Sequence, residues 1–252
     1  MTFKVKDKTI LIAGAKGAAN AIAELLCDNG AKVIVNDDNE KAMETITAPV
    51  AAKKQHGTSM DDAKKLVEEV IEEHGKIDVL IINYDEFKAG KKRLDQYTEE
   101  HYDKVMNGNV YPVFHYLAAI RPHFRERQDT GDLGAVLIMT SLVGSAGLDL
   151  ATMYAAAKGA VNGMIRSVAK EFGKFARVNG IAQGFYAEKT ARVGPKDRQK
   201  KFYMITSTWM SRFDLNYTDV APMAALLVSD DAKLISGQIF HVDGGLWLRV
   251  QA

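Results

Sequence analysis

The stretch Thr9-Ile-Leu-Ile-Ala-Gly-Ala-Lys-Gly17 decides the fold, because a short apolar run leads directly into a turn that contains two glycines. The run is rich in β-branched residues and ends at Gly14, which is typical of a buried strand. Residues 18–29 are expected to form a helix that Gly30 ends, and residues 31–35 a second strand. A strand, a helix and a strand in this order make a βαβ unit with parallel strands.

The same alternation continues along the chain. Further strands are predicted at 78–82, 135–139, 178–182 and 238–242, and helices at 64–74, 99–124, 154–172 and 220–229. The third strand is the least defined element, because the segment between Asp37 and His56 looks shortened. The alternation predicts an α/β fold, with one domain over residues 1–252 built on a doubly wound parallel sheet with helices on both faces. A barrel of eight βα units shares this length and alternation, so the first turn has to distinguish the two.

The composition excludes several classes of protein. Of the 252 residues 47% are hydrophobic and 26% are charged, which is typical of a soluble globular protein and excludes a disordered or fibrous one. A formal net charge of +1 argues against general nucleic-acid binding. The single Cys27 excludes an intramolecular disulfide and a Cys-rich zinc site, and the histidines are scattered, so no metal site is expected. The N-terminus predicts neither a signal peptide nor a membrane span, and we expect a cytoplasmic protein.

The turn after the first strand is a candidate dinucleotide site. Glycines at this place let the backbone approach a pyrophosphate, whose charge then lies at the helix N-terminus. The candidate cofactor-binding residues of the turn are Gly14, Lys16, Gly17 and Ala18. The turn lacks the full G-x-G-x-x-G pattern, and by itself it fits a tight turn without a ligand equally well.

Asp37 favours NAD as the cofactor. It follows the second strand, about 20 residues beyond the glycines, where an acid accepts hydrogen bonds from the adenosine ribose and repels a 2′-phosphate. The alternative is an ordinary polar residue at a strand end. Lys16 points the other way, because a cation in the turn could meet a 2′-phosphate. The residues therefore favour NAD and leave NADP open.

A tyrosine and a lysine lie four positions apart in Tyr154-Ala-Ala-Ala-Lys158, which places them on one face of a helix. A nearby ammonium stabilises phenolate and lowers the pKa of a tyrosine toward the range useful for proton transfer. Ser141 follows a predicted strand, at the edge of the sheet where open α/β folds bind ligands. By spacing alone, the tyrosine and lysine are more often an ordinary surface pair.

With Asn109 upstream, the residues Ser141, Tyr154 and Lys158 match the Asn-Ser-Tyr-Lys tetrad of the classical short-chain dehydrogenase/reductase family, which the chain resembles over essentially its whole length. Three further segments resemble family motifs in the expected order: Lys76–Leu80, Arg177–Gly184 and Ser236–Gly245. The resemblance implies a Rossmann-like fold and hydride transfer between a nicotinamide cofactor and a carbonyl or secondary alcohol.

The resemblance also implies a role for each residue. Tyr154 would be the general acid in reduction and the base in oxidation, and Lys158 would lower the Tyr154 pKa and hold the nicotinamide ribose. Ser141 would hydrogen-bond the substrate oxygen, and Asn109 would position a water between Lys158 and solvent. The other expected cofactor contacts are Asn83 and Gly184.

The chain departs from the family pattern in its cofactor half. The glycine motif is one residue short, and the Asn-Asn-Ala-Gly motif reads Ile82-Asn83-Tyr84-Asp85. Tyr84 would have to swing aside, and Asp85 would place a negative charge near an anionic ligand unless it turned outward. The family's aspartate after the third strand is absent, and Gln183 replaces a proline. Three functions remain open: a dehydrogenase/reductase with an adapted cofactor site, the same fold used for a different reaction or ligand, and a protein that binds a ligand or partner without dehydrogenase activity.

The regular alternation stops after Gly184, and we expect a substrate lid at about residues 185–212. Its segment 188–201 is basic and could receive an anionic substrate such as an acyl chain on a carrier protein or coenzyme A, although a solvated helix face is the more common explanation. The tetrad helix is most similar to that of 3-oxoacyl-carrier-protein reductases, and the resemblance implies a homodimer or homotetramer.

Overall fold

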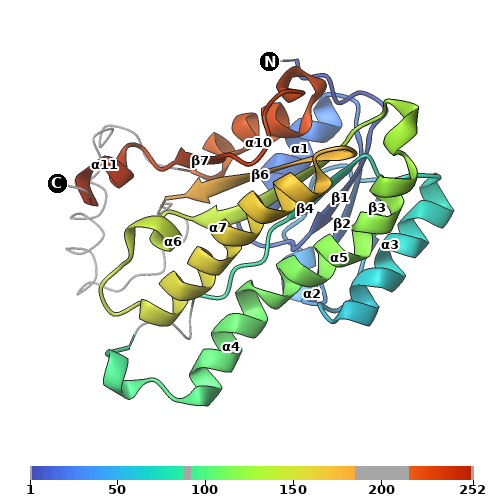
Figure 1. The fold of residues 1–252 in the computed structure, drawn as a ribbon. Helices are drawn as coiled ribbons and strands as arrows, with labels where there is room; N and C mark the ends of the chain where they lie inside the picture. The colour runs from blue at the N-terminus through green and yellow to red at the C-terminus, as the bar shows by residue number, and fades with distance from the viewer. Residues whose placement is uncertain (1, 88–91, 185–215, 251–252) are drawn as a thin grey trace.

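The computed structural model describes residues 2–87, 92–184 and 216–250. Seven parallel strands form one open sheet in the order β3-β2-β1-β4-β5-β6-β7 (Figure 1). The strands are β1 Thr9–Ala13, β2 Lys32–Asn36, β3 Ala52–Lys54, β4 Val79–Ile82, β5 Gly134–Ser141, β6 Ala176–Gln183 and β7 Ile239–Val242. The α-helices are α1 Ala19–Asp28, α2 Glu40–Met43, α3 Met60–His74, α4 Glu99–Asn109, α5 Tyr111–Glu126, α6 Val143–Ala146, α7 Thr152–Phe172, α10 Ala221–Val228 and α11 Leu246–Val250. The predicted doubly wound parallel sheet is confirmed, and the barrel is excluded because this sheet has two edge strands.

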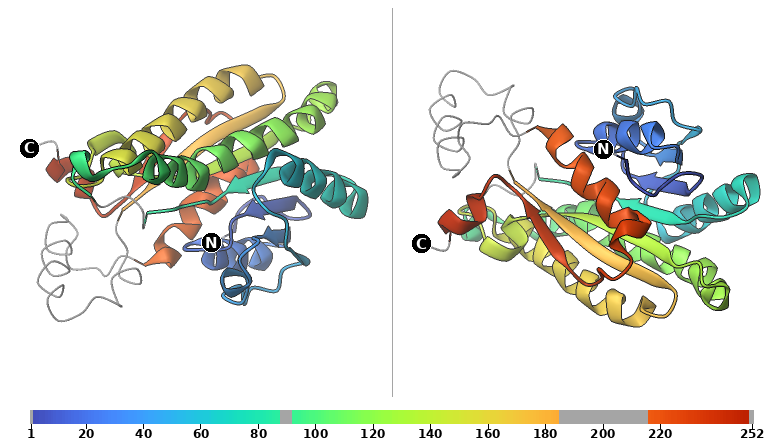
Figure 2. Two further views of the ribbon diagram at one scale, coloured as in Figure 1. Left: turned by 90° about the horizontal axis from the view of Figure 1, so that it is seen from below. Right: turned by 90° about the horizontal axis from the view of Figure 1, so that it is seen from above.

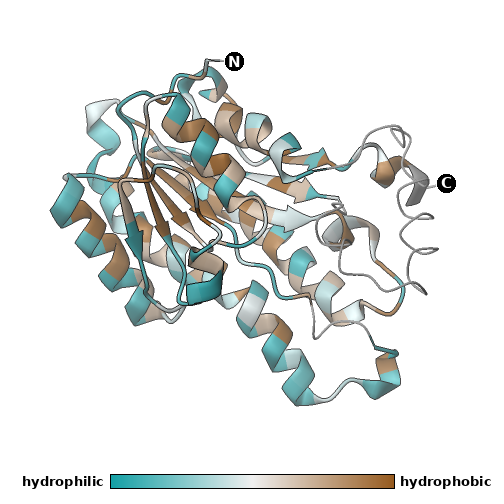
Figure 3. Cartoon of the chain, turned by 180° about the vertical axis from the view of Figure 1, so that it is seen from behind, coloured by the Kyte–Doolittle hydropathy of each residue, from teal (hydrophilic) through white to brown (hydrophobic). Residues whose placement is uncertain are grey.

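Helices cover both faces of the sheet. Helices α1 and α10 pack on one face, and α3, α5 and α7 pack on the other (Figures 1 and 2). Within β1, Ile10 and Ile12 belong to the first layer and Leu11 to the second, because successive side chains of a strand point to opposite faces. Both faces are therefore apolar, and the hydrophobic residues gather along the strands while the outer sides of the helices are hydrophilic (Figure 3).

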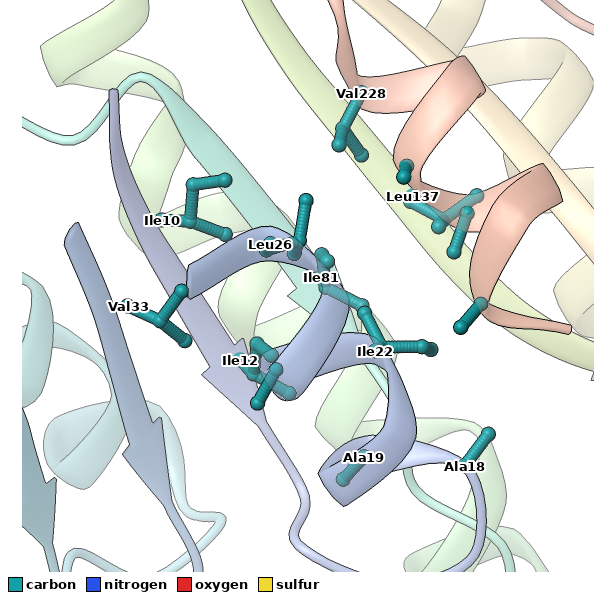
Figure 4. Packing of buried hydrophobic residues seen from close by; sticks show 14 of the residues in the cluster. Ile10, Ile12, Ala18, Ala19, Ile22, Leu26, Val33, Ile81, Leu137 and Val228 are labelled. Carbon is teal, nitrogen blue, oxygen red and sulfur yellow. The ribbon is translucent and has the colours of Figure 1, made fainter. Parts of the chain in front are cut away.

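Helix α1 packs on the sheet beside the candidate turn. Its residues Ile22 and Leu26 are one helical turn apart and fully buried against the layer that contains Ile10, Ile12 and other apolar side chains (Figure 4). Each such side chain contributes about 1.5–3 kcal/mol of hydrophobic stabilisation when it leaves water. This packing fixes the N-terminus of α1 at the end of β1.

The predicted single helix over residues 99–124 is wrong in one respect. The structure has two helices, α4 and α5, which meet at Val110. Pro112 lies in the first turn of α5, where its missing N–H is tolerated, whereas a continuous helix would need that N–H to bond the carbonyl of Gly108. The break places Asn109 at the end of α4, next to the sheet edge that carries the other candidate residues.

The strand order reverses beside β1, which has β2 on one side and β4 on the other. Open α/β sheets bind ligands outside the carboxyl ends of the strands at such a point. Gly14 follows β1, Asn83 follows β4 and Ser141 ends β5, so the sequence-predicted residues gather along this edge. None of the helices in the described ranges combines the length and the hydrophobicity that a membrane span requires.

Candidate active site

The glycine turn is fastened to the end of β4. Gly14 and Gly17 both adopt positive φ, and a Cβ on Gly14 would lie 2.5 Å from the carbonyl oxygen of Asn83. The Asn83 side chain donates hydrogen bonds to the carbonyl oxygens of Gly14 (3.1 Å) and Lys16 (2.6 Å). Asn83 therefore holds the shortened turn in place through the carbonyl groups of the turn.

The N-terminus of α1 lacks a side-chain cap. Ala18 is its N-cap residue and makes no side-chain capping hydrogen bond, and the first turn contains no acidic residue. The first N–H groups of a helix lack intrahelical acceptors and carry a partial positive charge, so they attract phosphate. Ala18 and Ala19 are fully buried, and their small side chains add no bulk beside the turn.

Asp37 hydrogen-bonds the backbone of the glycine turn. Its carboxylate is 3% exposed and accepts hydrogen bonds from the backbone N–H of Ala15 (2.8 Å) and of Asn39 (2.9 Å). Each of its two oxygens accepts one of these bonds, and the Asp38 side chain also hydrogen-bonds Asp37. The structure places Asp37 beside the glycine turn, and its contact with the adenosine ribose and its role in choosing a cofactor stay predictions.

The four tetrad residues lie at the neighbouring end of the sheet. Ser141 is the last residue of β5, Asn109 ends α4, and Tyr154 and Lys158 are one turn apart on α7, with the Lys158 Nζ 5.5 Å from the centre of the Tyr154 ring. All four are buried, with Asn109 fully enclosed and Tyr154 5% exposed. A phenol hydroxyl, an ammonium and a serine hydroxyl are therefore collected at one place, where they can exchange a proton with a bound oxygen.

A carboxylate from this chain already contacts two of these groups. The Tyr154 hydroxyl donates to Oδ1 of Asp85 over 2.6 Å, and the Lys158 Nζ lies 3.2 Å from the same oxygen. Asp85 thus does not turn outward. Burial raises the pKa of Tyr154 well above its usual value, and the negative charge and hydrogen bond of Asp85 raise it further, while a hydrogen bond with Ser141 acts in the opposite direction.

The Tyr84 side chain packs against α5, consistent with the expectation that its bulk must move aside. Its ring stacks on that of Tyr116 from α5, with 5.8 Å between centroids. The Tyr84 backbone carbonyl accepts a hydrogen bond from Lys158 Nζ at 3.2 Å. Burial raises the pKa values of both stacked phenols, and for Tyr116 the value rises to about 12.

Asn109 holds the backbone that carries Asp85. Its side chain accepts from the Glu86 N–H (3.2 Å) and donates to the Glu86 carbonyl (3.0 Å) and to the Val105 carbonyl (2.8 Å). The next residue, Phe87, packs edge to face on the Tyr154 ring with centroids 5.0 Å apart. We call residues 84–87 the strap. Sequence reasoning assigned Asn109 a water-positioning role and did not predict this contact.

Gly184 is the predicted cofactor contact at the end of β6, where the preceding residue Gln183 pairs with Ser141. Gly184 follows β6, where its N–H bonds the Val242 carbonyl and a Cβ would lie 2.8 Å from Cα of Asp243. The predicted lid at about 185–212 lies outside the described residues. The strap contacts were missed by sequence reasoning, and the replacement of a family glycine by Asp85 was the available signal.

The residues present fit a dinucleotide at two places and conflict with it at a third. The uncapped helix N-terminus suits the phosphates, and the carboxylate of Asp37 beside the turn suits a ribose. At the expected nicotinamide end, Asp85 engages Tyr154 and Lys158. The Asp85 side chain is 26% exposed, so it borders solvent. Among the described residues no cluster of His, Cys, Asp and Glu suited to a metal ion occurs.

Comparison with known proteins supplies the family. The family described as enoyl-(acyl carrier protein) reductase matches residues 12–247. The 3-oxoacyl-[acyl-carrier-protein] reductase of Thermotoga maritima is 32% identical over 96% of this chain and 99% of its own, and that of Staphylococcus aureus MW2 is 30% identical over 96% and 98%. Among solved structures, the 3-ketoacyl-(acyl-carrier-protein) reductase of Brucella melitensis complexed with NADH has a TM-score of 0.84 at 25% identity, covering 96% of this chain and 99% of that one. The ligand-free aldohexose dehydrogenase of Thermoplasma acidophilum, at 23% identity and a TM-score of 0.84 over 98% and 96%, shares the fold. The chain belongs to the short-chain dehydrogenase/reductase family.

Proposed function

We propose that this chain, an NAD(P)-dependent oxidoreductase, transfers a hydride between a nicotinamide cofactor and the 3-position carbonyl or alcohol of an acyl thioester. The observation that carries the proposal is the collection of Ser141, Tyr154 and Lys158 at the carboxyl edge of the sheet, where only β4 separates β5 from the strand that leads into the glycine turn. The thioester class is supported by relatives about 30% identical over nearly the whole chain that are named 3-oxoacyl-carrier-protein reductases. Cyclic alcohols, sugars and steroids are the competing substrate classes.

Each tetrad residue has a task that follows from its chemistry. When bound, the nicotinamide supplies or accepts the hydride. Tyr154 gives its hydroxyl proton to the substrate oxygen in reduction and takes it back in oxidation. Ser141 donates a hydrogen bond to the same oxygen as negative charge develops there, and Lys158 favours that charge and holds ribose hydroxyls. Asn109 positions the backbone of Glu86 through its paired hydrogen bonds.

The cofactor is held at the other end by the turn. Gly14, Gly17 and Ala18 let a pyrophosphate reach the N–H groups of α1, and Lys16 adds a positive charge there. Asn83 fixes the turn, and Gly184 borders the site from β6. The buried charge of Asp37 favours NAD over NADP, because a 2′-phosphate beside it would be repelled.

A dinucleotide titration tests the proposal. The quenching of protein fluorescence, or energy transfer to NADH and NADPH, is measured first, and acetoacetyl-coenzyme A is then offered with each cofactor. We expect NADH to bind at micromolar concentration and to reduce the thioester. Failure of both dinucleotides to bind below millimolar concentration contradicts the proposal. That result favours the second candidate, a ligand-binding protein without dehydrogenase activity, for which the Asp85–Tyr154 hydrogen bond is the supporting observation.

We also propose that the chain works as a cytoplasmic homodimer or homotetramer. Large side chains on the outer side of α4 and α5 support an assembly, since Tyr102, Tyr111 and Phe114 are each about half exposed. Sedimentation equilibrium tests it, and a stable monomer at micromolar concentration contradicts it.

A further inference from the structure

We propose that Asp85 is an internal ligand of the catalytic centre, which occupies the place of the substrate oxygen in the ligand-free enzyme and must rotate out before turnover. The proposal rests on the function proposed above. Its evidence is the geometry of the strap, residues 84–87, against α4 and α7. It makes Asp85 a residue that sets how tightly an outside carbonyl or carboxylate can bind at Tyr154.

The Tyr154 hydroxyl has only one proton to donate. A phenol has one O–H and can donate one hydrogen bond. Tyr154 gives that bond to Oδ1 of Asp85 at 2.6 Å. A substrate oxygen that is to receive the proton of Tyr154 therefore cannot bind productively while this bond exists.

The carboxylate of Asp85 also offsets the charge of Lys158. The Nζ of Lys158 lies 3.2 Å from the same Oδ1 atom, and Lys158 is 2% exposed. In a buried pair the carboxylate offsets most of the field of the ammonium, so Lys158 contributes little to stabilising a phenolate or an alkoxide. Release of Asp85 gives Lys158 back to the hydroxyl groups that the tetrad is expected to bind.

Hydrogen bonds hold the backbone of the strap on both sides of Asp85. On one side of Asp85 the Tyr84 carbonyl accepts from Lys158, and on the other side Glu86 is held by two hydrogen bonds to Asn109. The backbone is thus fixed at both neighbours, while the side chain of Asp85 is 26% exposed. Rotation of one side chain therefore opens the centre, and the strap itself keeps its place.

The sharpest test needs no cofactor and no substrate. Ultraviolet difference titration follows tyrosinate formation in the full-length protein, and subtraction of a Tyr154→Phe titration isolates Tyr154. We compare the native chain with Asp85→Asn, which keeps the shape, and Asp85→Gly, which empties the place. Asp149→Asn removes an equal charge from an exposed loop position and is the matched control.

In both Asp85 variants we expect Tyr154 to ionise at lower pH than in the native chain, with no change in Asp149→Asn. Sodium acetate should then restore the higher ionisation pH in Asp85→Gly, because an outside carboxylate takes the empty place, whereas sodium chloride at equal ionic strength should not. Equal ionisation in all the variants, or no difference between acetate and chloride, overturns the proposal. None of these readings depends on turnover, so an inactive enzyme would fail the proposed function without failing this test.

A second measurement decides the matter if the protein unfolds before Tyr154 ionises, as circular dichroism at each pH would show. NADH affinity is then measured at neutral pH. We expect Asp85→Gly to bind NADH about tenfold more tightly than the native chain, since a charged hydrogen bond no longer has to be broken. An affinity within twofold of the native value contradicts the proposal.

Discussion

The Tyr154 hydroxyl donates a 2.6 Å hydrogen bond to the carboxylate of Asp85. A tyrosine that serves as an acid or base normally gains from a nearby positive charge, which lowers its pKa. Here burial and the Asp85 carboxylate raise the Tyr154 pKa, although Lys158 stands one helical turn away. In the ligand-free centre Tyr154 is therefore held in its protonated form, and its proton lies in a hydrogen bond to Asp85.

Replacing Tyr154 with phenylalanine should abolish turnover and spare dinucleotide binding. The substitution removes the hydroxyl proton and leaves the glycine turn and Asp37 untouched. Loss of a positioned general acid costs at least about 10²-fold in rate. Steady-state reduction of acetoacetyl-coenzyme A and an NADH titration measure the two effects separately.

The matched control is Tyr102→Phe, which removes a phenol from an exposed position on α4. It should leave both the rate and the NADH affinity unchanged. Turnover retained in Tyr154→Phe would move the proton donor to another group.

Replacing Asp37 with asparagine should shift the cofactor preference toward NADP. The amide oxygen can still accept from the Ala15 N–H, so the turn keeps its support, while the charge that would repel a 2′-phosphate disappears. We expect the ratio of the NADPH and NADH dissociation constants to fall by about tenfold, an effect of about 1.4 kcal/mol. Parallel fluorescence titrations with the two reduced cofactors give this ratio.

Asp38→Asn is the control, because the neighbouring acid is exposed and has the same charge. An equal shift in both variants would mean that general charge, and not the position of Asp37, governs the preference.

The fold could be predicted because the central strands are fully buried. An apolar run such as β4 needs no partner to be recognised, and the structure places it within one residue of the prediction. The third strand was not predicted because β3 reads Ala-Lys-Lys. It is a short edge strand without the apolar run that identifies a buried strand. The break at Val110 escaped because the helical pattern continues across it and only Pro112 marks it.

Only the residues of the site that belong to a family motif could be predicted from the sequence. Ser141, Tyr154 and Lys158 were predicted from the resemblance to the family's tetrad, because spacing alone favours an ordinary surface pair for the tyrosine and the lysine. The direction of the Asp85 side chain does not, because it depends on partners from α4 and α7 that are distant in sequence. The same is true of Tyr84, whose ring is placed by Tyr116 from α5.

Replacing Gly14 with alanine should destabilise the protein and weaken NADH binding together. A Cβ there would lie 2.5 Å from the Asn83 carbonyl oxygen and 2.8 Å from its carbon, at a φ of +102°. Backbone atoms of a buried turn cannot move aside as a flexible side chain would, so we expect a loss of about 3 kcal/mol or more in the free energy of unfolding. Urea denaturation followed by circular dichroism measures it.

Gly131→Ala separates backbone strain from the clash. Gly131 also has a positive φ, +76°, but a Cβ there would meet nothing within 4 Å. Its cost should be about 1 kcal/mol, with NADH affinity unchanged. Equal losses in the two variants would show that the contact with Asn83 has no structural weight.

Tyr116 should make stability fall at alkaline pH. Its ring is fully buried, and its hydroxyl accepts from Asn36 Nδ2 at 3.1 Å. Burial raises its pKa to about 12, against about 10 in the unfolded chain. The raised value means that the folded state favours the protonated phenol, so the contribution to stability is fully present below about pH 10 and is lost as the pH rises toward 12, by up to about 1.4 kcal/mol per pH unit.

Tyr116→Phe tests this sign. At about pH 8 the variant should be less stable than the native chain by about 1 kcal/mol, because Asn36 loses a hydrogen-bond partner. Tyrosines that do not contact Tyr116 titrate alike in both proteins and cancel in the difference, so both chains are compared in a Tyr84→Phe background, which removes the one phenol that stacks on Tyr116. Urea denaturation at about pH 8 and about pH 11 should therefore show the native advantage shrinking or reversing at the higher pH, since the phenylalanine cannot ionise in the unfolded state. An advantage that stays constant would mean that Tyr116 ionises equally in the folded and unfolded chains, and that its burial beside Asn36 does not control its protonation.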